Sequence, residues 1–402
     1  MREQLYPLTG LRGLASAWVV LLHLQLLTPA LMPHVPVLST IISGGNLGVD
    51  IFFMLSGFVI TYTYLEKLAK PAPGALKRYL WLRVARIYPI HLATMLLVLC
   101  LVLLSAAAGS PPEAGRRFTP VNFMMNLFML QAVPPALAWN DPAWSISTEF
   151  AAYLVFPLLA PVLIRLKPRS AVVALVTILC AGMVLLLLIT YSAHEWPYWS
   201  GYALMWARIA ICFPVGALLC VFWRANTGLA ASNAAWMVPV SLAGIAVVSL
   251  LTPPAVALDL PVLAYPFIVL LLFGAAGGVG ACNRALSTRF MQWSGRISYS
   301  VYLIHFPVLL VVGQIVGIAG VEAGSPLAWV LLLLAFVAIT GAGAALYSFV
   351  EEPARKLIRR WTAPHAIPER GQRRPLPGSA RPASRGCGES PLRASDRRTA
   401  YR

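Results

Sequence analysis

Apolar runs long enough to cross a bilayer recur along this chain, separated by Pro, Gly or charged residues. About 20 consecutive apolar residues span the hydrocarbon core as one helix. Of the 402 residues, 59% are hydrophobic and only 11% are charged, whereas a soluble domain has roughly 25% charged residues. We therefore predict an all-α integral membrane protein, a bundle of about ten transmembrane helices. The expected spans are residues 8–28, 46–65, 88–108, 144–164, 171–191, 203–222, 235–252, 261–280, 297–317 and 327–349.

Basic residues follow every second span, and this alternation predicts the orientation of the bundle. Short cytoplasmic loops retain Lys and Arg, and such residues cluster after the second, fourth, sixth and eighth expected spans. Arg116 and Arg117, in the long loop before the fourth span, are the exceptions. Both termini are therefore expected in the cytoplasm. The first span is expected to remain as an uncleaved signal anchor, because Arg12 interrupts its start and no small-residue cleavage site follows it.

Positive charge is concentrated at the C-terminal end. Thirteen of the 31 Lys and Arg residues lie after Pro353, in a Pro-, Gly- and Ser-rich stretch with few large apolar residues. Such a composition cannot bury a core, so we predict a transmembrane domain over residues 1–353 and a basic, disordered cytoplasmic tail over residues 354–402. The tail either contacts anionic lipids or is a solvated extension, so the net charge of +17 does not indicate nucleic acid. The six cysteines lack metal-ligand spacing, and no metal is expected.

The first span, Leu8 to Thr28, contains two ionisable residues, Arg12 and His23. Eleven positions separate them, which is about three helical turns, so both lie on one face roughly 16 Å apart. Placing such a group in hydrocarbon costs on the order of 3 kcal/mol. Both side chains are therefore expected to face a polar cavity inside the bundle. The alternative is that Arg12 extends to the interface and His23 is a hydrogen-bonded histidine between helices.

Two carboxylates also fall within or beside apolar spans. Asp50 lies at the outer end of the second span, in a glycine-rich stretch that permits close approach of neighbouring helices. It is either a capping carboxylate at a helix N-terminus or the group that fixes the tautomer of His23. Glu149 lies inside the fourth span and needs a partner, for which Arg12, His23 and a substrate are the candidates.

Arg83 and Arg86 are three residues apart and so share a helical face. Guanidinium groups at that spacing suit a phosphate-bearing ligand, because each forms bidentate, charge-assisted hydrogen bonds. The ordinary excess of basic residues on the cytoplasmic side also explains them, and spacing by itself favours that explanation. The apolar middle of the loop from Gly109 to Trp144 predicts a short interfacial or re-entrant helix.

A further cluster of polar residues lies in the ninth span, within GRISYSVYLIHFP. Tyr299 and Tyr302 share a face near the inner boundary, where aromatic residues are common. We expect these two tyrosines and His305 to be structural rather than catalytic.

Taken together, these segments resemble the acyltransferase 3 family, membrane O-acyltransferases that modify surface polysaccharides, lipopolysaccharide, peptidoglycan or small natural products. The matching blocks occur in the family's order over about residues 8–360, and they are LTGLRG…VVLLH, GVDIFFMLSGFVI, RVARIYP, WSISTEF, GRISYSVYLIHFP and FVEEPARK. There are two departures from the family pattern. Thr9 stands where many members have Asp, and Phe150 stands where a second acidic residue often follows Glu149.

The resemblance implies an inner-membrane (plasma-membrane), multi-pass enzyme that moves an acyl group, expected to be acetyl, from cytoplasmic acyl-CoA to a hydroxyl of a carbohydrate or glycolipid acceptor. It also implies the site residues: His23, Arg12, Glu149 and Asp50 as catalytic groups, and Arg83 and Arg86 as ligands of the acyl-CoA. His23 would be a general base or a transient acyl carrier. The competing class is a multi-span transporter or flippase, in which the same charges form a substrate or proton path. Acceptor identity, acyl length and oligomeric state are left open.

Overall fold

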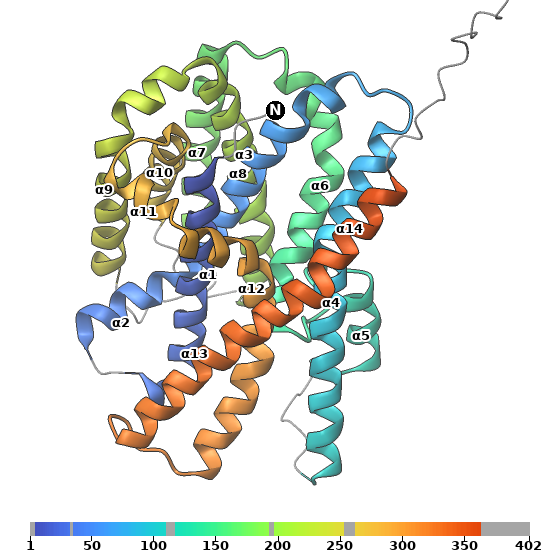
Figure 1. Ribbon diagram of the computed structural model, residues 1–402, viewed down its shortest axis with the longest axis vertical. Coiled ribbons are helices and arrows are strands. Elements are labelled where there is room, and N and C mark those ends of the chain that lie inside the picture. Colours follow the sequence, from blue (N-terminus) through green and yellow to red (C-terminus); the bar gives the residue numbers. More distant parts are fainter. Residues whose placement is uncertain (1–4, 33–34, 110–116, 193–196, 253–261, 363–402) are drawn as a thin grey trace, which may run out of the picture. The chain divides into compact units, whose positions relative to one another are not determined.

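The computed structural model describes residues 5–32, 35–109, 117–192, 197–252 and 262–362, and within these ranges the chain is helical with no strand. Figure 1 shows the helices in chain order. They are α1 Tyr6–Leu27, α2 Pro36–Ser43, α3 Leu47–Ala69, α4 Ala75–Ala107, α5 Pro120–Leu127, α6 Trp144–Leu163, α7 Pro168–Ser192, α8 Pro197–Ala225, α9 Thr227–Leu251, α10 Tyr265–Gly277, α11 Ala281–Leu286, α12 Arg289–Ile318, α13 Pro326–Leu346 and α14 Glu352–Trp361.

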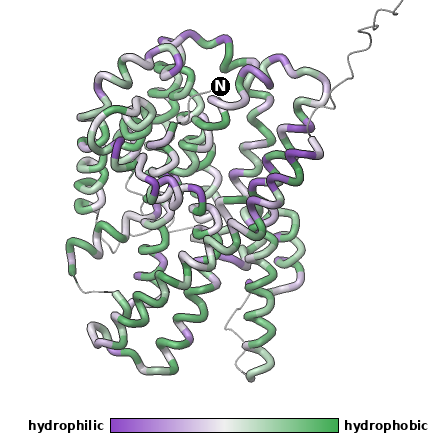
Figure 2. Tube along the Cα trace, in the orientation of Figure 1, coloured by the Kyte–Doolittle hydropathy of each residue, from purple (hydrophilic) through white to green (hydrophobic). Residues whose placement is uncertain are grey.

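Nine segments of the described chain are long and apolar enough to cross a membrane. They coincide with nine of the expected spans, and Figure 2 shows helices that are hydrophobic over most of their length. The predicted all-α integral membrane bundle is therefore confirmed. The expected span at 261–280 corresponds to a shorter apolar helix, Val262–Gly277, and residues 253–261 before it lie outside the described ranges.

The N-termini of several helices are explained by the residues found there. Proline, which lacks an N–H and has a fixed φ, occupies the first helical position of α5 and α13. In both cases the preceding hydroxyl caps the helix, since Thr119 accepts from the Asn122 N–H and Ser325 from the Ala328 N–H. α4 begins at Ala75 instead of near residue 88, so the basic segment expected as a loop is part of this helix.

The predicted close approach at Gly57 is confirmed where α3 packs against α8. A Cβ atom at Gly57 would lie 2.0 Å from the Phe213 carbonyl oxygen, and one at Gly216 would lie 1.9 Å from the Met54 carbonyl oxygen. Only glycine allows two helix backbones to come this close. One hydrophobic core runs through α1, α3, α6, α8, α10 and α12, and it surrounds the polar interior described below.

The helical chain continues past the expected domain boundary at residue 353. A π-helical turn, Tyr347–Glu351, joins α13 to α14, which ends at Trp361. Residues 354–361, expected to belong to a disordered tail, are therefore helical. Favourable charge placement contributes to this helix, because Glu352 pairs with Lys356 at 2.8 Å one turn later and basic residues occupy the last turn. The rest of the predicted tail lies outside the described residues.

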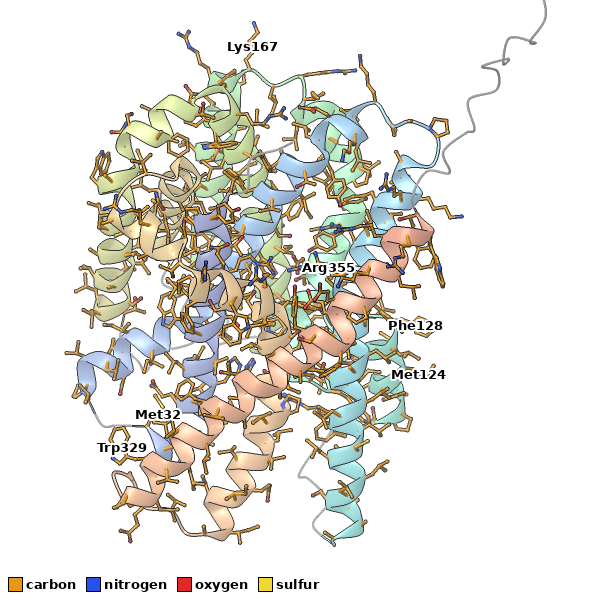
Figure 3. The ribbon with its side chains drawn as sticks, in the orientation of Figure 1. Met32, Met124, Phe128, Lys167, Trp329 and Arg355 are labelled. Atoms are coloured by element: carbon orange, nitrogen blue, oxygen red, sulfur yellow. The ribbon has the colours of Figure 1, made fainter. Side chains whose placement is uncertain are left out.

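The expected short helix in the long loop is α5, Pro120–Leu127. Met124 and Phe128 are 49% and 64% exposed, and Figure 3 shows both side chains pointing away from the neighbouring helices. This exposed apolar surface suits contact with lipid.

The alternating loops make the orientation testable. The α3–α4 and α6–α7 connections lie at the same end of the bundle, near the labelled Lys167, and the α12–α13 connection lies at the other end (Figures 1 and 3). A reporter fused after Arg169 or at the C-terminus is expected to be cytoplasmic, and one inserted at Arg117 extracytoplasmic, because short cytoplasmic loops retain basic residues. An alkaline phosphatase and green fluorescent protein pair measures this. An extracytoplasmic C-terminus would contradict the predicted orientation.

Candidate active site

The described helices line a cavity of ≈ 290 Å³ into which four arginines project. Its walls come from α1, α3, α4, α6, α12 and α14, so helices distant in sequence meet around it. The polar and charged residues that line it are Arg12, Ser56, Arg83, Arg86, Ser145, Glu149, Tyr153, Tyr299, Tyr302 and Arg355. Figure 3 labels Arg355 on α14, which packs beside α4. We refer to this as the arginine cavity.

Arg12 extends from α1 into the arginine cavity without a direct partner. Within the described part of the chain its guanidinium makes no hydrogen bond and no ion pair. It lies within electrostatic range of Arg86 and of the carboxylates of Glu149 and Glu351. Thr9, at the position where an acidic residue is common in the family, does not hold it. Arg12 is thus a partly buried cation with five N–H donors available to a ligand.

Arg83 and Arg86 both line the arginine cavity, as their shared helical face predicts. Their surroundings differ. Arg83 donates from Nη2 to the Tyr64 hydroxyl at 3.0 Å, and its guanidinium lies 5.0 Å from the centre of the same ring, a cation–π arrangement. Arg86 instead pairs with Glu351, with Nη1 3.2 Å from Oε1.

Glu351 is a buried carboxylate that the sequence reasoning missed. Besides Arg86, it lies 3.5 Å from Arg355 Nη1, and its Oε2 accepts a hydrogen bond from the Ser300 hydroxyl at 3.0 Å. A charged residue inside an expected span indicates a functional site, but the last expected span ends at residue 349. Glu351 lies two residues beyond that end and was therefore not considered. Four arginines and the carboxylate of Glu149 therefore line this cavity, and Glu351 pairs with two of the arginines. Positive charge is still in excess by two.

Glu149 is held by hydroxyl groups. Its Oε1 accepts hydrogen bonds from the Ser56 hydroxyl at 2.7 Å and from the Tyr153 hydroxyl one turn along α6 at 2.5 Å. Of the partners considered from sequence, Arg12 is near enough for electrostatic attraction only. Glu149 therefore faces the cavity as a positioned carboxylate.

Asp50 does not contact His23, and this corrects the hypothesis that it fixes the tautomer of that histidine. Asp50 is completely buried and forms a two-point ion pair with Arg208 of α8, with Nε to Oδ1 at 2.9 Å and Nη2 to Oδ2 at 3.1 Å. Arg208 also donates to the Asn46 carbonyl at 2.7 Å. The sequence reasoning overlooked Arg208, although it stands in the middle of an apolar span. Asp50 does not line the arginine cavity.

His23 packs against a second histidine. Its Nδ1 lies 2.9 Å from the Val19 carbonyl oxygen, so Nδ1 carries the proton and Nε2 is left as the basic nitrogen. The ring centre lies 4.8 Å from that of His305, at an interplanar angle of 64°. His305 is completely buried, and neither of its ring nitrogens has a hydrogen-bond partner within the described chain.

The histidine pair lies one aromatic layer behind the arginine cavity. Tyr302 lines the cavity, and its ring centre is 5.9 Å from that of His305. The Tyr302 hydroxyl in turn is 2.8 Å from the Ser145 hydroxyl. Tyr302 and Tyr299, expected to be structural, thus form part of the cavity wall, whereas His23 does not line it directly.

Fold and site together define a polytopic membrane protein with a buried cationic cavity and adjacent imidazole and carboxylate groups. A family model described as an acyltransferase domain matches residues 5–345. The chain therefore belongs to the acyltransferase 3 family, as its sequence blocks indicate, and is a membrane-embedded O-acyltransferase. This assignment favours the enzyme over the transporter or flippase.

Curated relatives agree with that assignment. The acyltransferase MdmB of Streptomyces mycarofaciens is 26% identical over 410 residues, which cover 95% of this chain and 96% of MdmB. YrhL of Bacillus subtilis, a proposed peptidoglycan O-acetyltransferase, is 23% identical over 87% of this chain and 54% of its own length. The O-acetyltransferase OatA of Staphylococcus aureus is 24% identical over 47% of this chain and 30% of its own length. No solved structure matches the chain.

Proposed function

We propose that this enzyme takes an acyl group, most simply acetyl, from cytoplasmic acyl-CoA and transfers it to a hydroxyl of a carbohydrate or glycolipid at the inner membrane. The observation that carries the donor assignment is the arginine cavity, where Arg12 has no partner among the described residues and positive charge is in excess. Coenzyme A carries phosphate groups, and guanidinium groups bind phosphate through paired, charge-assisted hydrogen bonds. Arg83, Arg86 and Arg355 would supply the contacts to the phosphates, which leaves Arg12 for the acyl carbonyl.

The transfer step needs a base for the acceptor hydroxyl. In the proposed reaction the hydroxyl oxygen attacks the thioester carbonyl carbon, a C–O bond forms, the C–S bond breaks, and CoA leaves as its thiolate. His23 Nε2 takes the hydroxyl proton, which then passes to the thiolate. An acyl-histidine intermediate is the other route compatible with the same residue. Arg12 would stabilise negative charge that develops on the carbonyl oxygen.

The acceptor assignment draws on the relatives. YrhL and OatA are named as O-acetyltransferases, the former as acting on peptidoglycan, and a carbohydrate hydroxyl is the group that such enzymes modify. Comparing ester-linked acetate on surface glycans of cells with and without the gene, by mass spectrometry, tests this proposal. In parallel, the purified protein is expected to release free CoA from acetyl-CoA. A transporter would release none.

Replacing Arg83 or Arg86 by alanine is expected to weaken acyl-CoA binding by about 1.5–3 kcal/mol, the contribution of one hydrogen bond to a charged group. This corresponds to roughly a ten- to hundredfold rise in the Kd of acetyl-CoA, measured by calorimetry on purified protein. Arg83 gives the cleaner result, because removing Arg86 also disturbs Glu351. Arg78→Ala is the matched control, since Arg78 is exposed on the same helix. Unchanged affinity in both variants would leave these arginines with a topological role only.

A further inference from the structure

A second cavity, of ≈ 240 Å³, lies between the segment from Arg117 to Asp141 and the first turns of α6 and α8. The residues that matter for its chemistry are Arg117, Gln131, Asp141, Trp144, Tyr202 and Met205. We refer to it as the loop cavity. On the predicted topology these turns are the extracytoplasmic ends of their helices. Nothing in the proposed donor site uses them.

The loop cavity and the arginine cavity share a wall. At the start of α6, Trp144 lines the loop cavity and the next residue, Ser145, lines the arginine cavity. One turn of α12 lines the arginine cavity through Tyr302 and lies next to the loop cavity, because the ring of Phe306 is 5.9 Å from the guanidinium of Arg117. His305, the ring partner of His23, stands in that same turn. The histidine pair thus lies beside the wall that the two cavities share, formed by Trp144, Ser145 and this turn of α12. We refer to this wall as the partition.

The lining of the loop cavity combines an aromatic ring with paired hydrogen-bonding groups. Arg117 donates to Asp141 at 2.7 Å, and the two side chains are 35% and 39% exposed, so both retain contact with the opening. Gln131 is 1% exposed. Its amide nitrogen donates to the Ala143 carbonyl at 2.7 Å, but its amide oxygen has no partner within the described residues. A buried acceptor without a donor is costly and fits a ligand that brings an O–H.

Sugars present apolar ring faces and edges rich in hydroxyl groups. An indole ring with a nearby charged pair and a free amide oxygen meets both requirements. The CoA phosphates fit the arginine cavity better than the loop cavity, because the Asp141 carboxylate would repel an anion in the loop cavity. The volume accommodates one ring-sized unit, so a polymer would place a single residue in the cavity and extend outside.

We infer that the loop cavity binds the acceptor, one sugar unit of a glycan or glycolipid, and presents its hydroxyl to the partition next to Ser145 and the histidine pair. This inference rests on the proposed function, since it takes the arginine cavity as the donor site. The acyl group then crosses only the partition, where the hydroxyl oxygen replaces the CoA sulfur on the carbonyl carbon. The acceptor never has to enter the cytoplasmic side of the protein.

Blocking the loop cavity from outside the cell tests the inference even while the acceptor is unidentified. Ala138→Cys and Met205→Cys place thiols on its lining. In the native host, cells are treated with the membrane-impermeant reagent sulfonatoethyl methanethiosulfonate, and ester-linked acetate released by mild alkali is measured before and after. We expect at least a tenfold loss of newly transferred acetate on labelling. The labelled, purified proteins are expected to keep the Kd of the unlabelled proteins for acetyl-CoA.

Two controls and four outcomes decide the matter. The unsubstituted chain controls for native cysteines, and Ala323→Cys places a thiol on the exposed α12–α13 connection, where labelling is expected to leave transfer unchanged. Loss of transfer through either substitution alone, with normal acetyl-CoA affinity, also supports the inference. Complete labelling with undiminished transfer overturns it, as does failure of the reagent to reach either thiol. Failure of the unsubstituted protein to bind acetyl-CoA would instead overturn the proposed function.

Discussion

Replacing His23 by alanine is expected to lower acyl transfer by about 10²- to 10⁴-fold, the contribution of a positioned general base. The physical reason is that Nδ1 is engaged by the Val19 carbonyl, so Nε2 is the nitrogen able to take the acceptor proton. Acetyl-CoA affinity should survive, because His23 does not line the arginine cavity. The measurement is ester-linked acetate in cells that carry equal amounts of inserted protein, together with the acetyl-CoA Kd of the purified variant.

His23→Phe separates chemistry from packing. Phenylalanine keeps an aromatic ring against His305, 4.8 Å away in the native pair, but has no nitrogen to accept a proton. If His23 is the base, His23→Phe should insert and fold normally yet be as inactive as His23→Ala. Near wild-type transfer by the phenylalanine variant would make His23 an interhelical packing residue, the alternative raised by the sequence, and would refute the mechanism.

Removing the Asp50 carboxylate is expected to reduce the free energy of unfolding by about 3–5 kcal/mol, because it leaves a buried guanidinium without its counter-charge. Arg208 is 4% exposed and cannot reach water to compensate. Thermal unfolding of Asp50→Ala in detergent, followed by size-exclusion chromatography with fluorescence detection, measures the loss. The effect on acyl transfer should follow the amount of folded protein.

The double replacement Asp50→Leu with Arg208→Met provides the matched test. Apolar residues of similar volume are often neutral or stabilising in place of a buried ion pair, so the double variant should be more stable than either single variant. This non-additivity is the signature of a direct interaction. A stable Asp50→Ala protein that has nevertheless lost acyl transfer would instead give Asp50 the catalytic role expected from the family resemblance.

The features that could be predicted from the sequence are those whose free energy depends on a single segment of the chain. A run of apolar residues forms a membrane-spanning helix because of its own length and composition, so the bundle and nine of its spans were predictable. A charge inside such a run is costly wherever the helix goes, and Arg12 and Glu149 were accordingly found facing a polar cavity. The same rule, applied to every span, would have identified Arg208 as well. α5 was predictable from an apolar stretch within a loop.

Only the tertiary structure decided which of these groups meet. Asp50 pairs with Arg208 rather than with His23, Arg86 pairs with Glu351 from the far end of the chain, and His23 lies against His305. Each pairing depends on the rotation and depth of two helices far apart in sequence, and these are set by packing such as the glycine contact of α3 with α8. The hydropathy of one segment gives the free-energy cost of burying a charge in it. It does not identify the partner of that charge, because the interaction energy depends on the positions of two helices.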